Sequence, residues 1–133
     1  MEFNMVMRIR IGTENFDLIL DEGPIRRYFE VSAPLLLEMS RWGDEYYGSC
    51  GVAGADINLS EYDESARREI MEVGEVAYWP SGDALCIFFG VTPVSTDERP
   101  RAVSPVIPLG RVGGDLNRLR RLGPTISAEI AAE

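Results

Sequence analysis

The stretch that decides the fold is EVAYWPSGDALCIFFG, residues 75–90. Residues 76–79 have the β-branched and aromatic character of a strand, and residues 80–83, Pro-Ser-Gly-Asp, are typical of a turn. Residues 84–89 have the pattern of a second strand and contain no charged side chain. The stretch therefore predicts a tight hairpin whose second strand is apolar on both faces. One face must fill a core, and the other must be covered or bind a ligand.

The length and charge of the chain limit its class and its partners. Its 133 residues suffice for one domain around one core, so we expect a single domain over residues 1–133. The 22 acidic residues against 13 basic ones give a formal net charge of −9, which repels nucleic acid and anionic membranes alike. No stretch is long and apolar enough to span a bilayer, and the charged N-terminus lacks the apolar core of a signal peptide. We therefore expect a cytoplasmic protein without nucleic-acid or membrane partners.

Several side chains on which common enzyme mechanisms depend are missing. The chain has no histidine, and its basic residues are all arginines, so the usual general base, Schiff-base amine and imidazole ligand are absent. A segment that begins like a calcium loop at Asp56 has Glu61 and Arg67 where such a loop needs glycine and glutamate. We predict no metal and no cofactor. Cys50 and Cys86 are interpreted as buried apolar residues that form no disulfide, because nothing activates a thiolate and the setting is expected to be reducing.

Hydrophobic alternation predicts short strands along most of the remaining chain. The predicted strands are residues 5–11, 16–20, 35–39, 44–50, 56–59, 106–112 and 125–131, the sixth of which needs an edge or a bulge at Pro108. Two short amphipathic helices are predicted at residues 24–32 and 115–122, and residues 92–105 are predicted to be a long surface loop. Many strands with two short helices indicate a mainly β chain, folded as a closed or nearly closed barrel whose ends the helices plug.

The order of these elements, with Gly110-Arg111-Val112 on a strand before the second helix, resembles that of cyclophilins. The phrases WGDE (42–45), AYWP (77–80), ALCIFFG (84–90) and Thr92-Pro93 resemble more specifically a small prokaryotic cyclophilin-like family of unknown function. The resemblance implies an eight-stranded antiparallel β-barrel with a helix at each end. It also implies a groove on the outer barrel wall, where cyclophilins isomerise X-Pro peptide bonds.

The residues that cyclophilins use for this chemistry are not matched. The predicted strand at 44–49 has no arginine, residues 85–89 contain no glutamine, and Val106 stands where a histidine is expected. The resemblance still implies an apolar outer wall. We assign binding on that wall to five side chains: Tyr47, Trp79, Leu85, Ile87 and Phe89.

Two interpretations of these residues and two functions stay open. Leu85, Ile87 and Phe89 either line a groove or pack beneath the predicted loop, and Tyr47 and Trp79 are either binding or packing residues. Asp44 and Glu45 are interpreted as a solvated pair.

The first of the two functions is binding of a peptide or a small apolar ligand without strong catalysis. The second is weak peptidyl-prolyl isomerase activity, which requires an apolar groove but no nucleophile. The oligomeric state is left open.

Overall fold

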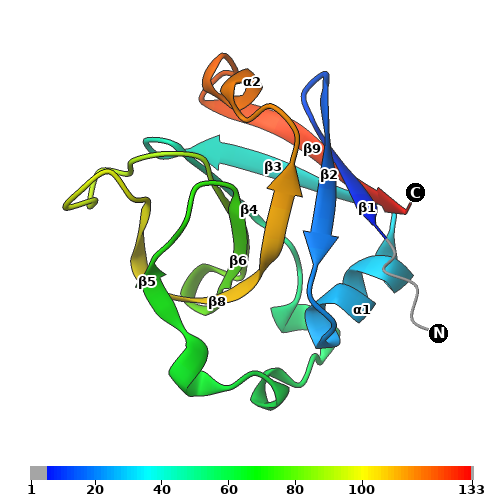
Figure 1. The fold of residues 1–133 in the computed structure, drawn as a ribbon. Coiled ribbons are helices and arrows are strands. Elements are labelled where there is room, and N and C mark those ends of the chain that lie inside the picture. The colour runs from blue at the N-terminus through cyan, green and yellow to red at the C-terminus, as the bar shows by residue number, and fades with distance from the viewer. Residues whose placement is uncertain (1–5, 133) are drawn as a thin grey trace.

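Short strands are the main secondary structure in the computed structural model, which describes residues 6–132 (Figure 1). The strands are β1 (Met7–Ile11), β2 (Glu14–Leu20), β3 (Leu35–Arg41), β4 (Glu45–Ser49), β5 (Arg68–Ile70), β6 (Glu75–Trp79), β7 (Ala84–Phe88), β8 (Arg101–Gly113) and β9 (Thr125–Ala132). The α-helices are α1 (Pro24–Ser32) and α2 (Asn117–Arg120), and single 3-10 turns lie at Ala53–Ala55, Leu59–Glu61, Glu64–Ala66 and Pro80–Gly82.

Eight of the strands pair in a closed ring. The order around the ring is β1, β9, β3, β4, β7, β6, β8 and β2, and the pairing of β2 with β8 closes it. Every pairing is antiparallel, and β5 extends the sheet by pairing with the first half of β8. The predicted fold, a mainly β chain with a closed eight-stranded antiparallel β-barrel and two short helices, is confirmed.

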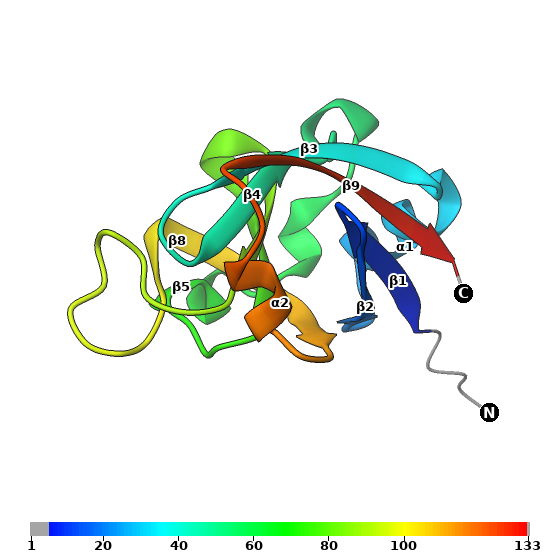
Figure 2. The same ribbon diagram turned by 90° about the horizontal axis from the view of Figure 1, so that it is seen from above.

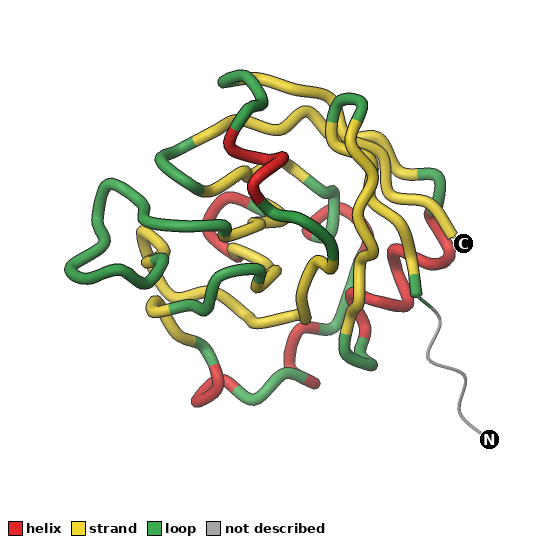
Figure 3. Tube along the Cα trace, turned by 45° about the horizontal axis from the view of Figure 1, so that its top comes forward, coloured by secondary structure: helices red, strands yellow, loops and turns green. Residues whose placement is uncertain are grey.

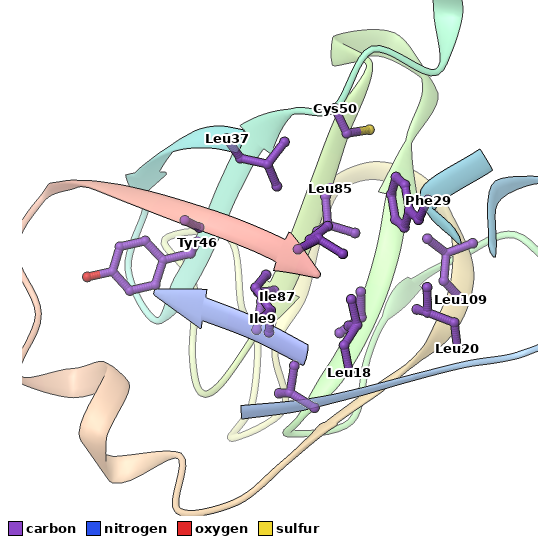
Figure 4. Close-up of a cluster of buried hydrophobic side chains, with 14 of the residues drawn as sticks. Ile9, Leu18, Leu20, Phe29, Leu37, Tyr46, Cys50, Leu85, Ile87 and Leu109 are labelled. Carbon is purple, nitrogen blue, oxygen red and sulfur yellow. The ribbon is translucent and has the colours of Figure 1, made fainter. Parts of the chain in front are cut away.

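Alternation along the strands fills the barrel. Met7, Ile9 and Ile11 of β1 are buried while Arg8 and Arg10 are exposed, as the sequence pattern predicts. Figure 4 shows the interior, into which side chains from β1, β2, β3, β4, β7 and β8 project. Residue 5 of the first predicted strand lies outside the described residues.

The two helices lie at opposite ends of the barrel in Figure 1. Helix α1 begins at Pro24, as predicted. Proline has no backbone N–H, but the first N–H groups of a helix have no partner within the helix, so nothing is lost at this position. Its Ile25 and Phe29 are fully buried in the barrel core. The Ile25 backbone N–H donates a hydrogen bond to the Tyr62 hydroxyl oxygen, with an N···O distance of 2.9 Å. Helix α2 is a single turn whose Leu119 is fully buried. Among the described residues, no helix has the length and apolar character needed to cross a membrane.

Three predicted boundaries differ from the structure. The predicted strand at 56–59 is wrong, because Asp56 is left-handed with φ 57° and the Asn58 side chain caps the 3-10 turn that follows it. The predicted helix at 115–122 is reduced to residues 117–120, since one turn suffices to bury Leu119. The predicted strand at 106–112 already begins at Arg101, because β5 offers it a partner there. The protruding loop, predicted at residues 92–105, therefore runs over residues 89–100 (Figures 2 and 3).

Strand β8 passes from the outside of the barrel into its wall. Its first half pairs with β5, where Arg68 is opposite Val106, and its second half pairs with β6 and β2. A register shift falls where Val76 is opposite Gly110 and Ala77 is opposite Pro108, which leaves one extra residue in β8. Of the two alternatives predicted for Pro108, an edge or a bulge, the structure thus has a bulge directly beside it.

Strand β7 is buried on both faces, and this corrects the predicted binding wall. Leu85, Ile87 and Phe89 are fully buried in the core inside the barrel, not on its outer wall. Figure 4 shows Leu85 and Ile87 in this core. The predicted covering of these three by the loop is also wrong, for the same reason. The outward-facing residues of β7 are Cys86 and Phe88. Because the side-chain period of a strand is two, an error of one residue moves the whole set to the opposite face.

The outer face of β7 has a small core of its own. Cys86 and Phe88 pack there with Met71, Ala77, Ala102 and Val106, all buried. Ala102 and Val106 come from the first half of β8, which folds back over the barrel wall after the protruding loop. Partly buried Tyr47 and Trp79 pack against the edge of this second core.

Closure of the ring is predicted to depend on Gly110. This residue has φ +151° and lies opposite Leu20, and a Cβ there would be 2.0 Å from the backbone oxygen of Ile19. Gly110→Ala should lower the free energy of unfolding by about 2–4 kcal/mol, through backbone strain and steric overlap at the β2–β8 pairing. Urea denaturation measures this.

Gly54→Ala is the matched control, because a Cβ at Gly54 meets no atom within 4 Å. It should change the free energy of unfolding by less than about 1 kcal/mol. Equal stability of the two variants would contradict the role assigned to the β2–β8 pairing.

Candidate functional site

An open, apolar pocket of about 220 Å³ lies on the outer barrel wall, beside the second core. It is lined by side chains from the β3–β4 turn and from β4, β6, β7 and β8. These residues are Trp42, Glu45, Tyr47, Trp79, Cys86, Ala102, Val103 and Val106. The register of strand pairing explains why the lining residues of β4, β6 and β7 lie on the same face of the sheet.

Strand pairing brings the residues of the pocket floor together. Tyr47 lies opposite Cys86, and Glu45 lies opposite Phe88, so that Glu45 and Cys86 are diagonal neighbours on one face. Trp79 is on the same outer face of the sheet, since Ala77 of β6 is opposite Cys86. The floor is therefore built on rigid, paired strands and not on loops.

The indole of Trp79 is held from two sides. Its Nε1–H donates a hydrogen bond to the Ser104 hydroxyl of β8 at 2.7 Å. Gly82, in the turn after β6, leaves room for the ring, because a Cβ there would be 2.3 Å from it. Trp79 thus joins the hairpin turn to the folded-back half of β8 and fixes one wall of the pocket.

The opposite wall is the β3–β4 turn, which carries Trp42. Reciprocal backbone hydrogen bonds join Trp42 to Glu45 at 2.8 and 3.2 Å. Asp44 accepts from Arg41 at 2.9 Å and from Arg120 at 2.7 Å, which joins this turn to α2. The turn is therefore anchored. The prediction of a solvated Asp44–Glu45 pair is wrong, because Asp44 is paired with two arginines and Glu45 is buried.

Glu45 is the unusual residue of the pocket, because it is a carboxyl group in apolar surroundings. Its exposed fraction is 5%, and its Oε1 atom has no hydrogen-bond partner among the described residues. Burial raises the pKa of this carboxyl from 4.5 to about 7, and the neighbouring Cys86 thiol opposes the shift. A buried polar atom without a partner costs about 1–3 kcal/mol, so such an atom beside a pocket points to a partner supplied from outside.

The two cysteines are buried thiols. Both are free. Burial raises the pKa of Cys50 to about 12, and burial together with the Glu45 carboxyl raises the pKa of Cys86 well above its usual value. Neither thiol is therefore ionised near neutral pH, which agrees with the interpretation of both as apolar residues.

A second, more polar hollow of about 190 Å³ lies where β1, β2 and the end of β8 approach α2. Its Arg118 is already engaged, since it pairs with Glu14 at 3.0 Å, donates to the Asn15 carbonyl and stacks over Phe16. No cluster of three or more potential metal-ligating side chains occurs within residues 6–132. The outer-wall pocket is thus the better candidate site.

The structure divides the predicted binding residues into two groups. Tyr47 and Trp79 line the pocket, whereas Leu85, Ile87 and Phe89 are inside the barrel. Sequence reasoning missed the remaining lining residues, above all Trp42, Glu45 and Cys86. One signal was available: Glu45, Tyr47 and Cys86 alternate onto one face of the predicted sheet once β4 and β7 are paired.

Comparisons with known proteins agree with this architecture. A family model described as cyclophilin-like matches residues 5–129. The chain is similar to a hypothetical protein from Archaeoglobus fulgidus, whose solution structure superimposes with a TM-score of 0.73. The two chains are 29% identical, over 98% of this chain and 95% of that one. No curated protein matches the chain.

The Glu45 carboxyl is predicted to make stability depend on pH. Because its folded pKa, about 7, is higher than the ordinary 4.5, the folded state holds the proton more strongly. The stabilisation that comes from this stronger proton binding is complete below pH 4.5 and is lost as the pH rises through 7. Glu45→Gln should remove this loss, which is on the order of 3 kcal/mol between pH 4.5 and pH 8. Urea denaturation across this pH range measures it.

The exposed Glu64 supplies the control. Glu64→Gln should keep the pH dependence of the wild-type protein. If Glu45→Gln keeps it as well, the assignment of the raised pKa to Glu45 is refuted.

Proposed function

The chain belongs to the cyclophilin-like family, and we propose that its outer-wall pocket binds a small apolar group, carried by a peptide or a small molecule, without strong catalysis. The observation that carries this proposal is the open, largely apolar lining of the pocket, to which both tryptophans of the chain contribute. Pockets for drug-sized ligands usually have roughly 300–1,000 Å³. At about 220 Å³, this pocket is suited to a single apolar side chain or a small ring.

The lining supports binding more than isomerisation. Catalysis of X-Pro isomerisation needs groups that stabilise the twisted amide better than either planar form. None of the eight lining residues is an arginine, a histidine or a glutamine. The indole N–H of Trp79 already donates to Ser104. The pocket therefore offers desolvation of an apolar group, worth about 25 cal/mol per Å² buried, without strong differential stabilisation.

Binding is predicted to change the intrinsic fluorescence, because Trp42 and Trp79 are the only tryptophans of the chain and both line the pocket. Titration with 3-methylbutan-1-ol and with N-acetylproline methylamide should give a saturable change for at least one of them. Val103 is 55% exposed at the pocket, so Val103→Phe narrows the pocket without disturbing either core. It should weaken binding about tenfold.

The matched control is Val31→Phe, at an 87% exposed position on α1. This variant should bind like the wild-type protein. Absence of any saturable change in the wild-type protein, or equal binding by the two variants, would count against the pocket as the binding site.

Isomerase activity is predicted to be weak or absent. In a proline-isomerisation assay on a tetrapeptide, the rate with this protein should stay near the uncatalysed rate, because the pocket lacks the required donor. A known cyclophilin run in parallel gives the reference. If the rate with this protein is comparable to that of the reference, its function is isomerisation and not binding alone.

A further inference from the structure

The pocket combines features that together specify a ligand more narrowly than apolar character alone. Three aromatic side chains, Trp42, Tyr47 and Trp79, line a small space that also contains Glu45. Aromatic ring faces attract cations, and indole attracts them most strongly. An apolar neutral ligand would use the aromatic surface but would leave the Glu45 Oε1 atom without a hydrogen-bond partner.

No residue of the pocket lining balances the charge of the Glu45 carboxylate. The lining contains no arginine, and the arginines nearest in sequence to lining residues have other partners. Arg41 pairs with Asp44, and Arg101 pairs with Glu69 at 3.1 Å. Glu45 is 95% buried and its Oε1 atom accepts no hydrogen bond from the described residues. A positively charged hydrogen-bond donor would supply both the missing partner of Oε1 and a counter-charge for the carboxylate.

On this basis we propose that the pocket binds a tertiary ammonium group, whose single N–H meets the Glu45 carboxylate and whose alkyl substituents contact Trp42, Tyr47 and Trp79. This inference rests on the proposed function of the same pocket and names the ligand class. A primary ammonium has three donors and is strongly hydrated, whereas the lining of the pocket contains one carboxylate and is otherwise mostly apolar or aromatic. A tertiary ammonium needs one acceptor and presents apolar groups elsewhere. The formal net charge of −9 also favours a cation over an anion.

The site is expected to respond to pH through Glu45. The other titratable groups that share the pocket with it are Cys86 from β7 and Tyr47 from its own strand, while β6 and β8 contribute Trp79 and apolar side chains. Beside Glu45 in the turn, Asp44 is paired with Arg41 and Arg120. Because burial raises the pKa of Glu45 to about 7, the carboxylate that a cation requires is mostly present at pH 8 and mostly protonated at pH 6. Binding of a cation should therefore release a proton.

The test uses two probes of nearly equal shape and different charge. 2-(Dimethylamino)ethanol is a tertiary ammonium at both pH values, and 3-methylbutan-1-ol is its neutral carbon isostere. In a fluorescence titration at pH 8, the wild-type protein should bind the ammonium at least about tenfold more tightly than the alcohol. From pH 8 to pH 6, binding of the ammonium should weaken about tenfold, whereas binding of the alcohol should not weaken.

Glu45→Gln is the informative variant, because it keeps the shape of the side chain and removes the charge. It should bind the two probes equally at pH 8 and lose the pH response, while Glu64→Gln should behave like the wild-type protein. If the wild-type protein binds the alcohol as tightly as the ammonium, the tertiary-ammonium inference is overturned while the proposed apolar binding stands. If it binds neither probe, nor N-acetylproline methylamide, both are overturned.

Discussion

The structure depends on one constraint, which is that strand β7 has no face suited to water. Leu85 and Ile87 on one side and Cys86 and Phe88 on the other are all buried. Burying both sides requires two separate apolar clusters, one inside the closed ring and one outside it. The closed ring supplies the first. The second exists because β8 begins outside the barrel, packs Ala102 and Val106 on the outer face of the sheet and then enters the wall.

The candidate site arises where this outer covering ends. Phe88 is fully buried in the outer cluster that Ala102 and Val106 of β8 help to form, whereas an open space remains beside Cys86, lined by Trp42 and Trp79. Both indoles are held by the same features that build the fold. Trp79 donates to Ser104 of β8, and Trp42 belongs to the turn that Asp44 fixes to α2 through Arg120. The pocket is thus formed by rigid elements, with Glu45 as its one buried carboxyl group.

The sequence predicted the barrel well because its signals are local. Alternation at Met7, Ile9 and Ile11, the proline at position 24 and the hairpin turn at 80–83 each depend on neighbouring residues only. The face of β7 could not be predicted in this way, since Leu85 and Cys86 are both apolar and nothing local separates inside from outside. The pocket that contains Glu45 is completed by Ala102, Val103 and Val106 of β8, more than fifty residues further along the chain. Of the five predicted binding residues, Tyr47 and Trp79 therefore line the pocket, whereas Leu85, Ile87 and Phe89 lie in the core.

We propose that ligands bind on the outer wall between β4, β7 and β8. The most direct measurement is a map of amide chemical-shift changes on a 15N-labelled sample, recorded while a library of small apolar and ammonium-bearing fragments is added. The largest changes should cluster at residues 42–47, 79, 86 and 102–106. Changes that cluster instead at the hollow beside Arg118, or fragments that bind with no changes at the outer-wall pocket, would contradict it.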